Sequence, residues 1–250
     1  MIQVAIIGAG FIGPAHLEAL RRLGDVEVVA LCDSRLEAAQ RKARALNIAH
    51  AYDSVEALLA HPGLQVVHNC TPNHLHAQIN RQILAAGLHV FSEKPLCMTA
   101  EEARELVALA ARAGVVHGVS FVYRQFAMVQ QAAAMIRHGE VGRIFAAHGS
   151  YLQDWMLLET DYNWRVDSAQ GGASRTVADI GSHWCDTVQF MTGRRIVEVM
   201  ADLSIVWPTR KAPVNGKATF SAVHEAQAYE TRPVDTEDFG SVQIGRASCR

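Results

Sequence analysis

A glycine-rich segment near the start of the chain has the spacing that binds the phosphates of a dinucleotide. Residues 8–13 read GAGFIG, follow the apolar run 2–7 and open a helical pattern. In this context Gly8 permits a tight turn, Gly10 lets a pyrophosphate approach the backbone, and Gly13 lets helix and strand pack closely. The phosphates then meet the N–H groups at the start of the helix. The predicted cofactor contacts here are Gly8, Gly10, Phe11, Ile12 and Gly13.

An acidic residue further along indicates which dinucleotide binds. Asp33 lies 20 residues beyond Gly13 and directly follows the apolar run 26–32. Its carboxylate can accept hydrogen bonds from the adenosine ribose hydroxyls, and it would repel a 2′-phosphate, so NAD is favoured over NADP. Arg35 stands two residues on and could pair with that phosphate instead, which keeps NADP open. The alternative role of Arg35 is a solvated helix start.

Two further segments end apolar runs and therefore fall at the same sheet edge, where ligands bind in open α/β sheets. Residues 70–76 read CTPNHLH and residues 93–95 read EKP. We expect cofactor contacts from Thr71, Pro72, Asn73, His76, Glu93 and Lys94. Asn73 could equally serve only as a helix N-cap. No metal site is expected, because His74 and His76 lack a third ligand nearby. A cis Lys94–Pro95 peptide would aim the lysine inward.

Taken jointly, the motifs resemble the glucose–fructose oxidoreductase / inositol dehydrogenase / MocA family over nearly the whole chain. They are residues 8–13, Thr71-Pro72-Asn73 with His76, Glu93-Lys94-Pro95, and Gly171-Gly172 before Asp179 and His183. The resemblance implies a Rossmann domain, then an α+β domain with a mostly antiparallel sheet, and an active site between them. Members oxidise or reduce a carbinol carbon of a sugar, sugar acid or cyclitol. It further implies that Lys94 contacts the substrate hydroxyl and the nicotinamide side of the cofactor, with Asp179 and His183 completing the catalytic set.

The residue types suit that chemistry. Oxidising an alcohol requires that its oxygen loses a proton, and an imidazole with a pKa near ~6.5 is matched to this transfer at neutral pH. Asp179 precedes His183 by one expected helical turn, so its carboxylate could orient or charge the ring. The Lys94 ammonium could stabilise the developing alkoxide. An Asp-x-x-x-His pair more often lies on a helix surface, but its place after Gly-Gly and alongside Lys94 favours catalysis. Metal binding by these two with Cys185 and Asp186 is remote, since one helix cannot point all four one way.

Aromatic residues concentrate in the segment 152–172, which we predict to be the substrate loop. Tyr151, Trp155, Tyr162 and Trp164 crowd together in a chain that is 7% aromatic. Aromatic faces suit the apolar face of a pyranose, whereas aromatic packing under a long loop is the alternative role. The predicted substrate-binding residues are Trp155, Trp164 and Arg165, joined through the family resemblance by Tyr123 and Arg124.

Positioning these residues requires strands that alternate with helices. Apolar runs at 2–7, 26–32, 65–70, 89–91 and 115–119 alternate with helical patterns at 14–23, 36–46, 74–86 and 100–113. This predicts a doubly wound parallel sheet, an NAD(P)-binding Rossmann domain over residues 1–120. A substrate-binding α+β domain is expected over 121–242. Its expected elements are a helix at 126–138, a strand at 143–151, an irregular stretch at 152–172, a helix at 177–191, a strand at 196–206 and a polar stretch without clear period at 208–238.

Composition argues against several other classes of protein. The formal net charge of −2 gives no reason to expect nucleic acid or an anionic membrane as partner. Five cysteines without paired spacing do not predict a disulfide scaffold. No signal peptide and no membrane-spanning run is recognised, so we expect a cytoplasmic NAD(P)-dependent dehydrogenase or reductase with a sugar or polyol substrate. A dinucleotide-binding sensor without turnover, or an NAD-dependent glycosidase of the same fold, are the alternatives; a sensor would need neither Lys94 nor His183.

The end of the chain is expected to be incomplete. By resemblance, family members continue well beyond this point, and when full length the protein is expected to form a homo-oligomer. Residues 243–250 read QIGRASCR, which lacks the alternating pattern of a strand and predicts a non-native tail. A sheet without its later strands would leave an unpaired edge and an uncovered apolar face. We therefore expect low activity and a mobile second domain in a chain of this length.

Overall fold

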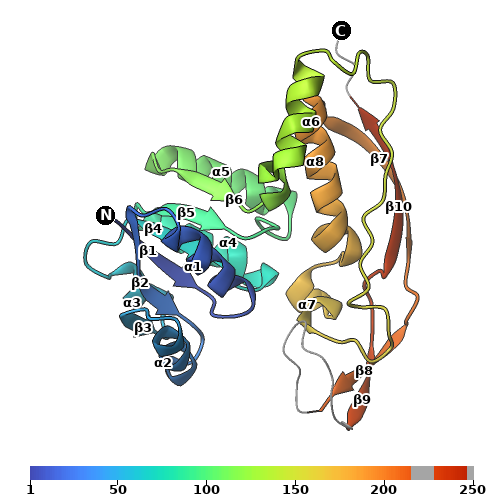
Figure 1. The fold of residues 1–250 in the computed structure, drawn as a ribbon. Helices are drawn as coiled ribbons and strands as arrows, with labels where there is room; N and C mark the ends of the chain where they lie inside the picture. The colour runs from blue at the N-terminus through green and yellow to red at the C-terminus, as the bar shows by residue number, and fades with distance from the viewer. Residues whose placement is uncertain (215–227, 247–250) are drawn as a thin grey trace. The chain divides into compact units, whose positions relative to one another are not determined.

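A computed structural model describes residues 1–214 and 228–246. The chain divides into two compact units, Met1–Ser120 and Phe121–Arg250 (Figure 1). In the described residues no helix is long and apolar enough to cross a membrane.

The first unit is built on a six-stranded parallel sheet with strand order β3-β2-β1-β4-β5-β6. The strands are β1 Ile2–Ile7, β2 Val26–Cys32, β3 His50–Tyr52, β4 Val66–Asn69, β5 His89–Ser92 and β6 His117–Val119. The order reverses between β1 and β4, and this is where a doubly wound sheet opens a ligand crevice. The predicted Rossmann fold is confirmed.

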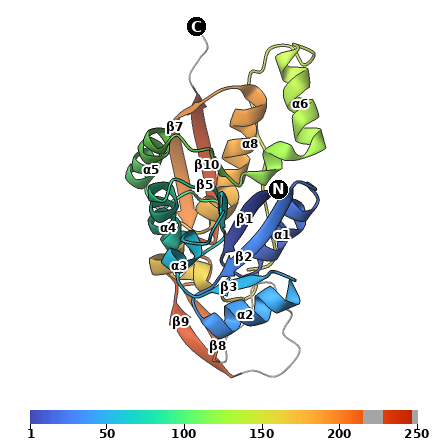
Figure 2. The same cartoon turned by 90° about the vertical axis from the view of Figure 1, so that its left-hand side faces the viewer.

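Helices cover both faces of this sheet. They are α1 Ile12–Arg21, α2 Leu36–Ala45, α3 Val55–Leu59, α4 Asn73–Ala85 and α5 Ala100–Ala113. Side chains of β1 alternate between the faces, so Val4 and Ile6 pack with α1 and α2, whereas Ala5 and Ile7 pack with α3, α4 and α5. Helices α4 and α5 lie side by side (Figure 2). The short elements β3 and α3 were not predicted, because three to five residues are too few to show a period.

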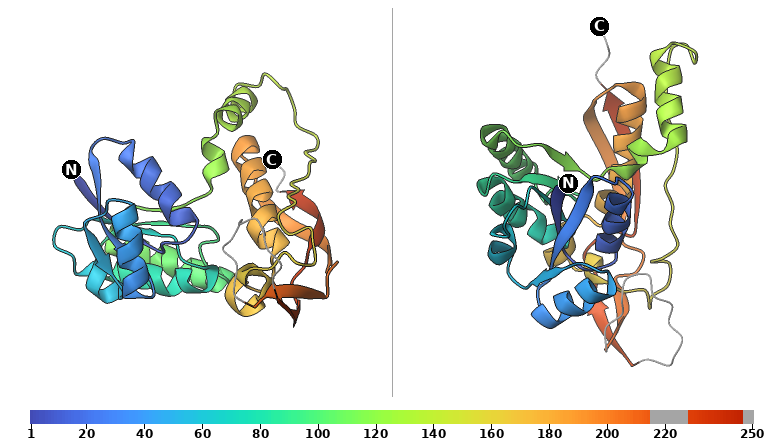
Figure 3. Two further views of the ribbon diagram at one scale, coloured as in Figure 1. Left: turned by 60° about the horizontal axis from the view of Figure 1, so that its bottom comes forward. Right: turned by 60° about the vertical axis from the view of Figure 1, so that its left-hand side comes forward.

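The second unit combines helices with antiparallel strands, and the predicted α+β class is confirmed. Its helices are α6 Ala127–Arg137, α7 Ser168–Gly171 and α8 Ser182–Thr192, with 3-10 turns at Val122–Gln125 and Trp164–Val166 and a π-helical turn at Val177–Gly181. Its strands are β7 Ile196–Ser204, β8 Thr209–Pro213, β9 Tyr229–Pro233 and β10 Phe239–Arg246. Strand β10 pairs antiparallel with β7, and β8 pairs antiparallel with β9 (Figure 3). Helix α6 packs beside α8.

Three expectations for this unit are wrong and a fourth is modified. Residues 143–151 are assigned to no strand in the described part of the chain, because apolar alternation by itself does not supply the backbone ladder that stabilises a strand. The 152–172 stretch is not wholly irregular, because it contains the Trp164–Val166 turn and α7. The polar stretch 208–238 contains β8 and β9, which are held by each other's backbone rather than by an apolar period. The expected 177–191 helix is present, but its first five residues, Val177–Gly181, form a π-helical turn in place of an α-helical one.

The end of the described chain also departs from expectation. Strand β10 continues to Arg246, although the pattern predicted no strand beyond Val242. Backbone pairing with β7 supplies the hydrogen bonds there, and Gly245 lies against Glu198, where a Cβ atom would come within 2.7 Å of the Glu198 Cβ. Residues 247–250 of the expected tail lie outside the described residues. Residues 197–204 of β7 are all exposed, Val199 and Met200 by 63% and 64%, so this ladder presents apolar side chains at its surface.

Candidate active site

The glycine loop has the geometry that a dinucleotide needs. Gly8 has φ +99°, and a Cβ atom there would come within 2.5 Å of the Cys70 carbonyl oxygen. A Cβ on Gly13 would collide with the Gly8 carbonyl oxygen, so helix α1 can approach β1 only with glycine at this position. A Cβ atom on Gly10, in contrast, would meet no heavy atom of the described residues within 4 Å apart from its chain neighbours, which leaves open space for a pyrophosphate. The residues present therefore fit the cofactor.

The Asp33 carboxylate is fixed by three hydrogen bonds, one of them from the glycine loop. Its Oδ2 accepts from the backbone N–H of Ala9 at 3.1 Å, and its Oδ1 accepts from Ser34 N and Oγ at 2.7 and 3.3 Å. The carboxylate thus lies next to the place where the adenosine ribose binds in this fold. Arg35 is the extended N-cap residue of α2 and is exposed. That position matches the solvated helix start considered for it.

Buried polar side chains hold the turn after β4 through hydrogen bonds. Asn69 Oδ1 accepts from Thr71 Oγ1 at 2.7 Å, and Asn69 Nδ2 donates to Asn80 Oδ1 at 2.9 Å. Helix α4 begins at Asn73 with Pro72 as its N-cap, so the capping role considered for Asn73 is wrong. His76 is only 1% exposed, which places its ring beneath the sheet edge rather than at the edge. Asn69 and Asn80 were missed because a lone asparagine in an apolar run carries no pattern.

The turn after β5 presents Lys94. The Lys94–Pro95 peptide is cis, as expected. Glu93 Oε2 accepts from the Lys94 N–H at 3.1 Å, and Glu93 Oε1 lies 2.9 Å from His16 Nε2. Burial acts to raise the pKa of Glu93, but hydrogen bonds from His16 and Ser120 outweigh it and hold that pKa below its usual value. The Glu93 carboxylate is therefore an internal anchor of this turn, and its predicted contact with the cofactor stays a prediction.

In the second unit, Asp179 contacts Arg165, whose guanidinium in turn lies over two tryptophans of the predicted substrate loop. Arg165 Nε lies 3.4 Å from Asp179 Oδ2, and both side chains are mostly buried. The guanidinium of Arg165 lies over the rings of Trp164 and Trp155, at 4.4 and 5.7 Å from their centroids. Cation–π contact holds a guanidinium in one orientation. The structure thus brings together Trp155, Trp164, Arg165 and Asp179.

The π-helical turn separates Asp179 from His183. It closes an i→i+5 hydrogen bond from Ser182 N to Val177 O, so the two residues are not related by the regular α-helical turn that was expected. Single π-turns inside helices are frequent at functional sites. His183 follows in the first turn of α8 and is 7% exposed.

Aromatic rings surround His183. The Tyr123 ring lies 4.4 Å from it between centroids at an interplanar angle of 37°, and Phe121 meets it edge-on at 5.9 Å. The Tyr123 and Tyr151 hydroxyls are hydrogen-bonded to each other. Burial, with this hydrogen bond, raises the pKa of Tyr151 to about 12. Phe121 was not among the predicted site residues, and its nearness to His183 arises from tertiary packing alone.

Arg124 has a partner that was not anticipated. Its guanidinium forms two hydrogen bonds with Asp186 of α8, one of them from Nε to Oδ2 at 2.7 Å. This hydrogen bonding raises the pKa of Arg124. Asp186 is 8% exposed, so the pair fastens the 122–125 turn to α8. The predicted contact of Arg124 with substrate stays a prediction.

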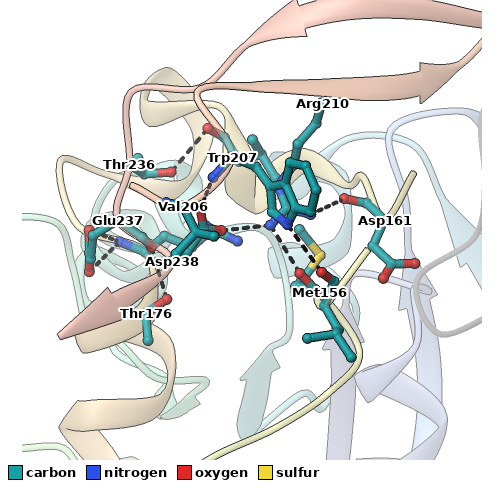
Figure 4. Close-up of polar contacts among 12 residues, drawn as sticks. Met156, Asp161, Thr176, Val206, Trp207, Arg210, Thr236, Glu237 and Asp238 are labelled. Atoms are coloured by element: carbon teal, nitrogen blue, oxygen red, sulfur yellow. Dashed lines mark hydrogen bonds and ion pairs between the residues drawn. The ribbon is translucent and has the colours of Figure 1, made fainter. Parts of the chain in front are cut away.

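A buried charge cluster holds residues 156–161 of the predicted substrate loop (Figure 4). Arg210 of β8 is fully buried and donates to the Leu158, Asp161 and Met156 carbonyl oxygens at 2.8, 2.8 and 3.0 Å. It also donates to Asp238 Oδ1 at 2.6 Å, and Arg175 pairs with the same carboxylate. Asp238 Oδ2 accepts from the Val206 and Trp207 N–H groups at 2.9 Å. Loop 156–161, β8 and the end of β7 are thereby joined through one carboxylate.

Glu237, next to Asp238, holds the segment that leads into the π-turn. Its carboxylate accepts from Ser174 Oγ at 2.7 Å and from Val177 N at 2.9 Å. Neither Glu237 nor Asp238 was predicted to matter, because both lie in a polar stretch whose partners are distant in sequence. The Glu237 bonds span 60 and 63 residues, and the bonds of Asp238 to Arg210 and Arg175 span 28 and 63 residues.

A doubly wound parallel sheet with this glycine loop defines a dinucleotide-binding protein. Residues 2–121 match the family model described as oxidoreductase family, NAD-binding Rossmann fold, and residues 129–246 match the GFO/IDH/MocA C-terminal domain. The chain belongs to the GFO/IDH/MocA family of oxidoreductases. The family resemblance drawn from the motifs is thus confirmed.

Several relatives have names that describe reactions of sugars. Levoglucosan dehydrogenase of Pseudarthrobacter phenanthrenivorans is 31% identical over 95% of this chain and 62% of its own length. D-glucoside 3-dehydrogenase of Escherichia coli is 34% identical over 77% of this chain and 54% of its own length. A structure of levoglucosan dehydrogenase in complex with NADH and levoglucosan matches with a TM-score of 0.86 and 29% identity, covering 98% of this chain and 63% of that one. The chain therefore spans less than two thirds of the length of these relatives.

Proposed function

We propose that this protein is an NAD-dependent dehydrogenase or reductase that transfers a hydride between nicotinamide and a carbinol carbon of a sugar, sugar derivative or cyclitol. The observation that carries the proposal is the Asp179–Arg165 pair stacked on Trp164, close in sequence to a His183 enclosed by aromatic rings. Charged donors beside flat aromatic faces are the chemistry that binds pyranose rings. The sugar-directed names of the relatives support the same substrate class.

Each residue then has a definite task. When bound, the nicotinamide supplies or accepts the hydride. His183 takes the proton from the substrate hydroxyl in the oxidative direction and returns it in the reductive direction. Lys94 stabilises the negative charge that develops on the same oxygen. Asp179, held by Arg165, orients the reacting hydroxyl and its proton acceptor. Lys94 belongs to the first unit and the others to the second, so their joint action is part of the proposal.

A substrate panel tests this function directly. The protein is mixed with NAD⁺ or NADP⁺ and with levoglucosan, methyl glucosides, free aldoses and inositols, and the reduced cofactor is followed by its absorbance. We expect turnover with at least one sugar or cyclitol. NADH that binds without turnover of any polyol would favour the sensor, and glycoside cleavage without net NADH release would favour the glycosidase.

We expect the Asp33→Ser variant to lose its preference for NADH over NADPH by about tenfold or more, which corresponds to ~1.4 kcal/mol. The Asp33 carboxylate is fixed beside the glycine loop, where it would repel a 2′-phosphate, and its removal leaves Arg35 free to approach that phosphate. Fluorescence titration with both reduced cofactors measures the ratio of the two Kd values. Asp25→Ser is the matched control, because Asp25 is an exposed carboxylate before the opposite end of β2. Tighter binding of NADPH than NADH by the unaltered protein would refute the argument.

A further inference from the structure

Two buried histidines from different helices hold the residues on either side of Lys94. His16 lies on α1, and its Nε2 is 2.9 Å from Glu93 Oε1. His76 lies on α4, and its Nδ1 is 2.6 Å from the Pro95 carbonyl oxygen. The two side chains are 9% and 1% exposed. We call this pair the histidine clamp, and neither member belongs to the reaction chemistry set out above.

The first half of the clamp is a chain of hydrogen bonds from α1 to the Lys94 backbone. His16 Nδ1 is 2.9 Å from His68 Nδ1 on β4, which fixes the ring orientation and leaves Nε2 for Glu93. Burial, then the charge of His16, lowers the pKa of His68 to about 3, so His68 is neutral at physiological pH. The second oxygen of Glu93 accepts from the Lys94 N–H. A shift of His16 would therefore be passed to Lys94 through one rigid carboxylate.

The second half ties two turns of the sheet edge together. The other ring nitrogen of His76, Nε2, is 2.7 Å from the Thr71 carbonyl oxygen. Both partners are carbonyl oxygens, which only accept, whereas a neutral imidazole has a single N–H. The ring therefore makes both bonds only when it is doubly protonated, and as a neutral ring it keeps one of them. Burial lowers the pKa of His76, while the Pro95 and Thr71 carbonyls and the charge of Glu93 act to raise it and Lys94 acts to lower it.

We propose that His16 and His76 are positioning residues for Lys94, which fix its turn to the two helices that begin at the cofactor edge. Helix α1 starts at Ile12, within the glycine motif, and α4 starts at Asn73, after the Thr71-Pro72 turn. The start of α1, where the cofactor phosphates would bind, and the Lys94 turn are then held in one rigid frame. A misplacement of a reacting group by about 1 Å costs on the order of 10²-fold in rate, so such a frame matters for the reaction. That consequence rests on the proposed function, whereas the placement of Lys94 can be measured without it.

Replacing each histidine by asparagine and by glutamine distinguishes two roles: a hydrogen bond that positions Lys94, and a side chain that only fills space. The amide nitrogen of asparagine takes the place of Nδ1 and that of glutamine the place of Nε2. At position 16 the Nε2 bond reaches the Lys94 turn, so His16→Gln keeps the anchor and His16→Asn loses it. At position 76 the Nδ1 bond reaches the turn, so His76→Asn keeps it and His76→Gln loses it. If the histidines position Lys94, glutamine is the milder substitution at position 16 and asparagine is the milder one at position 76. If they only fill space, the milder substitution is the same at both positions.

The readout is the reactivity of the Lys94 amine from about pH 7 to about pH 10, spanning the titration of a lysine. Competitive acetylation with acetic anhydride, followed by peptide mass spectrometry, compares Lys94 with Lys42 of α2 in the same molecule. We expect His16→Asn and His76→Gln to change the Lys94 to Lys42 ratio by about threefold or more, which is about half a pKa unit. His16→Gln and His76→Asn should stay near the unaltered protein. His74→Asn and His74→Gln are matched controls, because His74 is exposed on the same α4 helix.

Steady-state kinetics provides a second, separate measurement. Once a substrate is known, kcat should fall about 10-fold to 100-fold in His16→Asn and His76→Gln, while the Kd for NADH measured by fluorescence stays within about threefold. The proposal would be overturned if the same amide, asparagine or glutamine, were the milder substitution at both positions. An unchanged Lys94 acetylation profile in all four variants would overturn it as well. If no sugar is turned over, the proposed function fails, and the acetylation profiles still decide whether the clamp positions Lys94.

Discussion

Replacing His183 or Lys94 by alanine is expected to lower kcat by ~10²–10⁴-fold while the Kd for NADH changes little. In the proposed mechanism the His183 imidazole moves the substrate proton, and the Lys94 ammonium stabilises charge that exists only in the transition state. Neither group is needed to hold the pyrophosphate, which meets the glycine loop at the start of α1. Stopped-flow measurement of hydride transfer, together with fluorescence titration of NADH, separates the two effects.

Matched controls come from the half-buried Lys42 and the exposed His138, residues of the same types outside the predicted site. Lys42→Ala on α2 and His138→Ala at the end of α6 should leave both kcat and the NADH affinity unchanged. In the double variant Lys94→Ala/His183→Ala, the fold-reduction in kcat should be far smaller than the product of the two single fold-reductions if both residues act on one oxygen. The effects of groups that act as a unit are not additive. Near-normal turnover in either single variant would remove that residue from the proposed mechanism.

The Asp238→Asn substitution is expected to reduce the free energy of unfolding of the second unit by about 3–5 kcal/mol. Its carboxylate is the shared counter-charge of Arg175 and Arg210, whose side chains are 4% and 0% exposed. Without it, two buried cations face each other uncompensated, and the charged link from Arg210 to the Val206 and Trp207 N–H groups is lost. Urea unfolding followed by tryptophan fluorescence measures this loss, since all four tryptophans of the sequence lie beyond residue 120.

The same carboxylate predicts an acid sensitivity. Burial acts to raise the pKa of Asp238, but the Trp207 N–H and the two arginines hold it below the ordinary value of 3.8. A group whose pKa is lower in the folded state stabilises the fold fully above its unfolded pKa. Its contribution is therefore present above about pH 4 and is lost as the pH falls through the folded value. Asp202→Asn, at an exposed carboxylate of β7, is the control. A loss for Asp238→Asn no larger than that of the control would show that the cluster contributes nothing.

The sequence by itself determined the first unit and its cofactor loop. Each strand and helix there shows its own period over a few residues, and the glycine roles are local: Gly8 needs a positive φ, and Gly13 must lie against the carbonyl of a residue five positions earlier. Parallel strands joined by helices have a strongly preferred handedness, so the order of elements settled the topology. The candidate catalytic residues Lys94, Asp179 and His183 were also predicted from the sequence, through joint motifs rather than through any one pattern, and their roles stay predictions.

The strand predicted at 196–206 is present as β7, but tertiary structure alone decided β8, β9, the end of β10 and the charge cluster of the second unit. Strands β8 and β10 pair with strands that are distant in sequence, β9 and β7. Such pairing leaves no periodic pattern within either strand, so the sequence does not predict it. The π-turn before His183 results from hydrogen bonding that residue types do not encode. The anchors of the site, His16 on Glu93 and Arg210 on Asp238, join residues 77 and 28 positions apart. In the sequence, a polar residue that will be buried cannot be told from any other polar residue until the fold shows its partner. The stabilising energy belongs to the hydrogen-bonded pair and not to either residue alone.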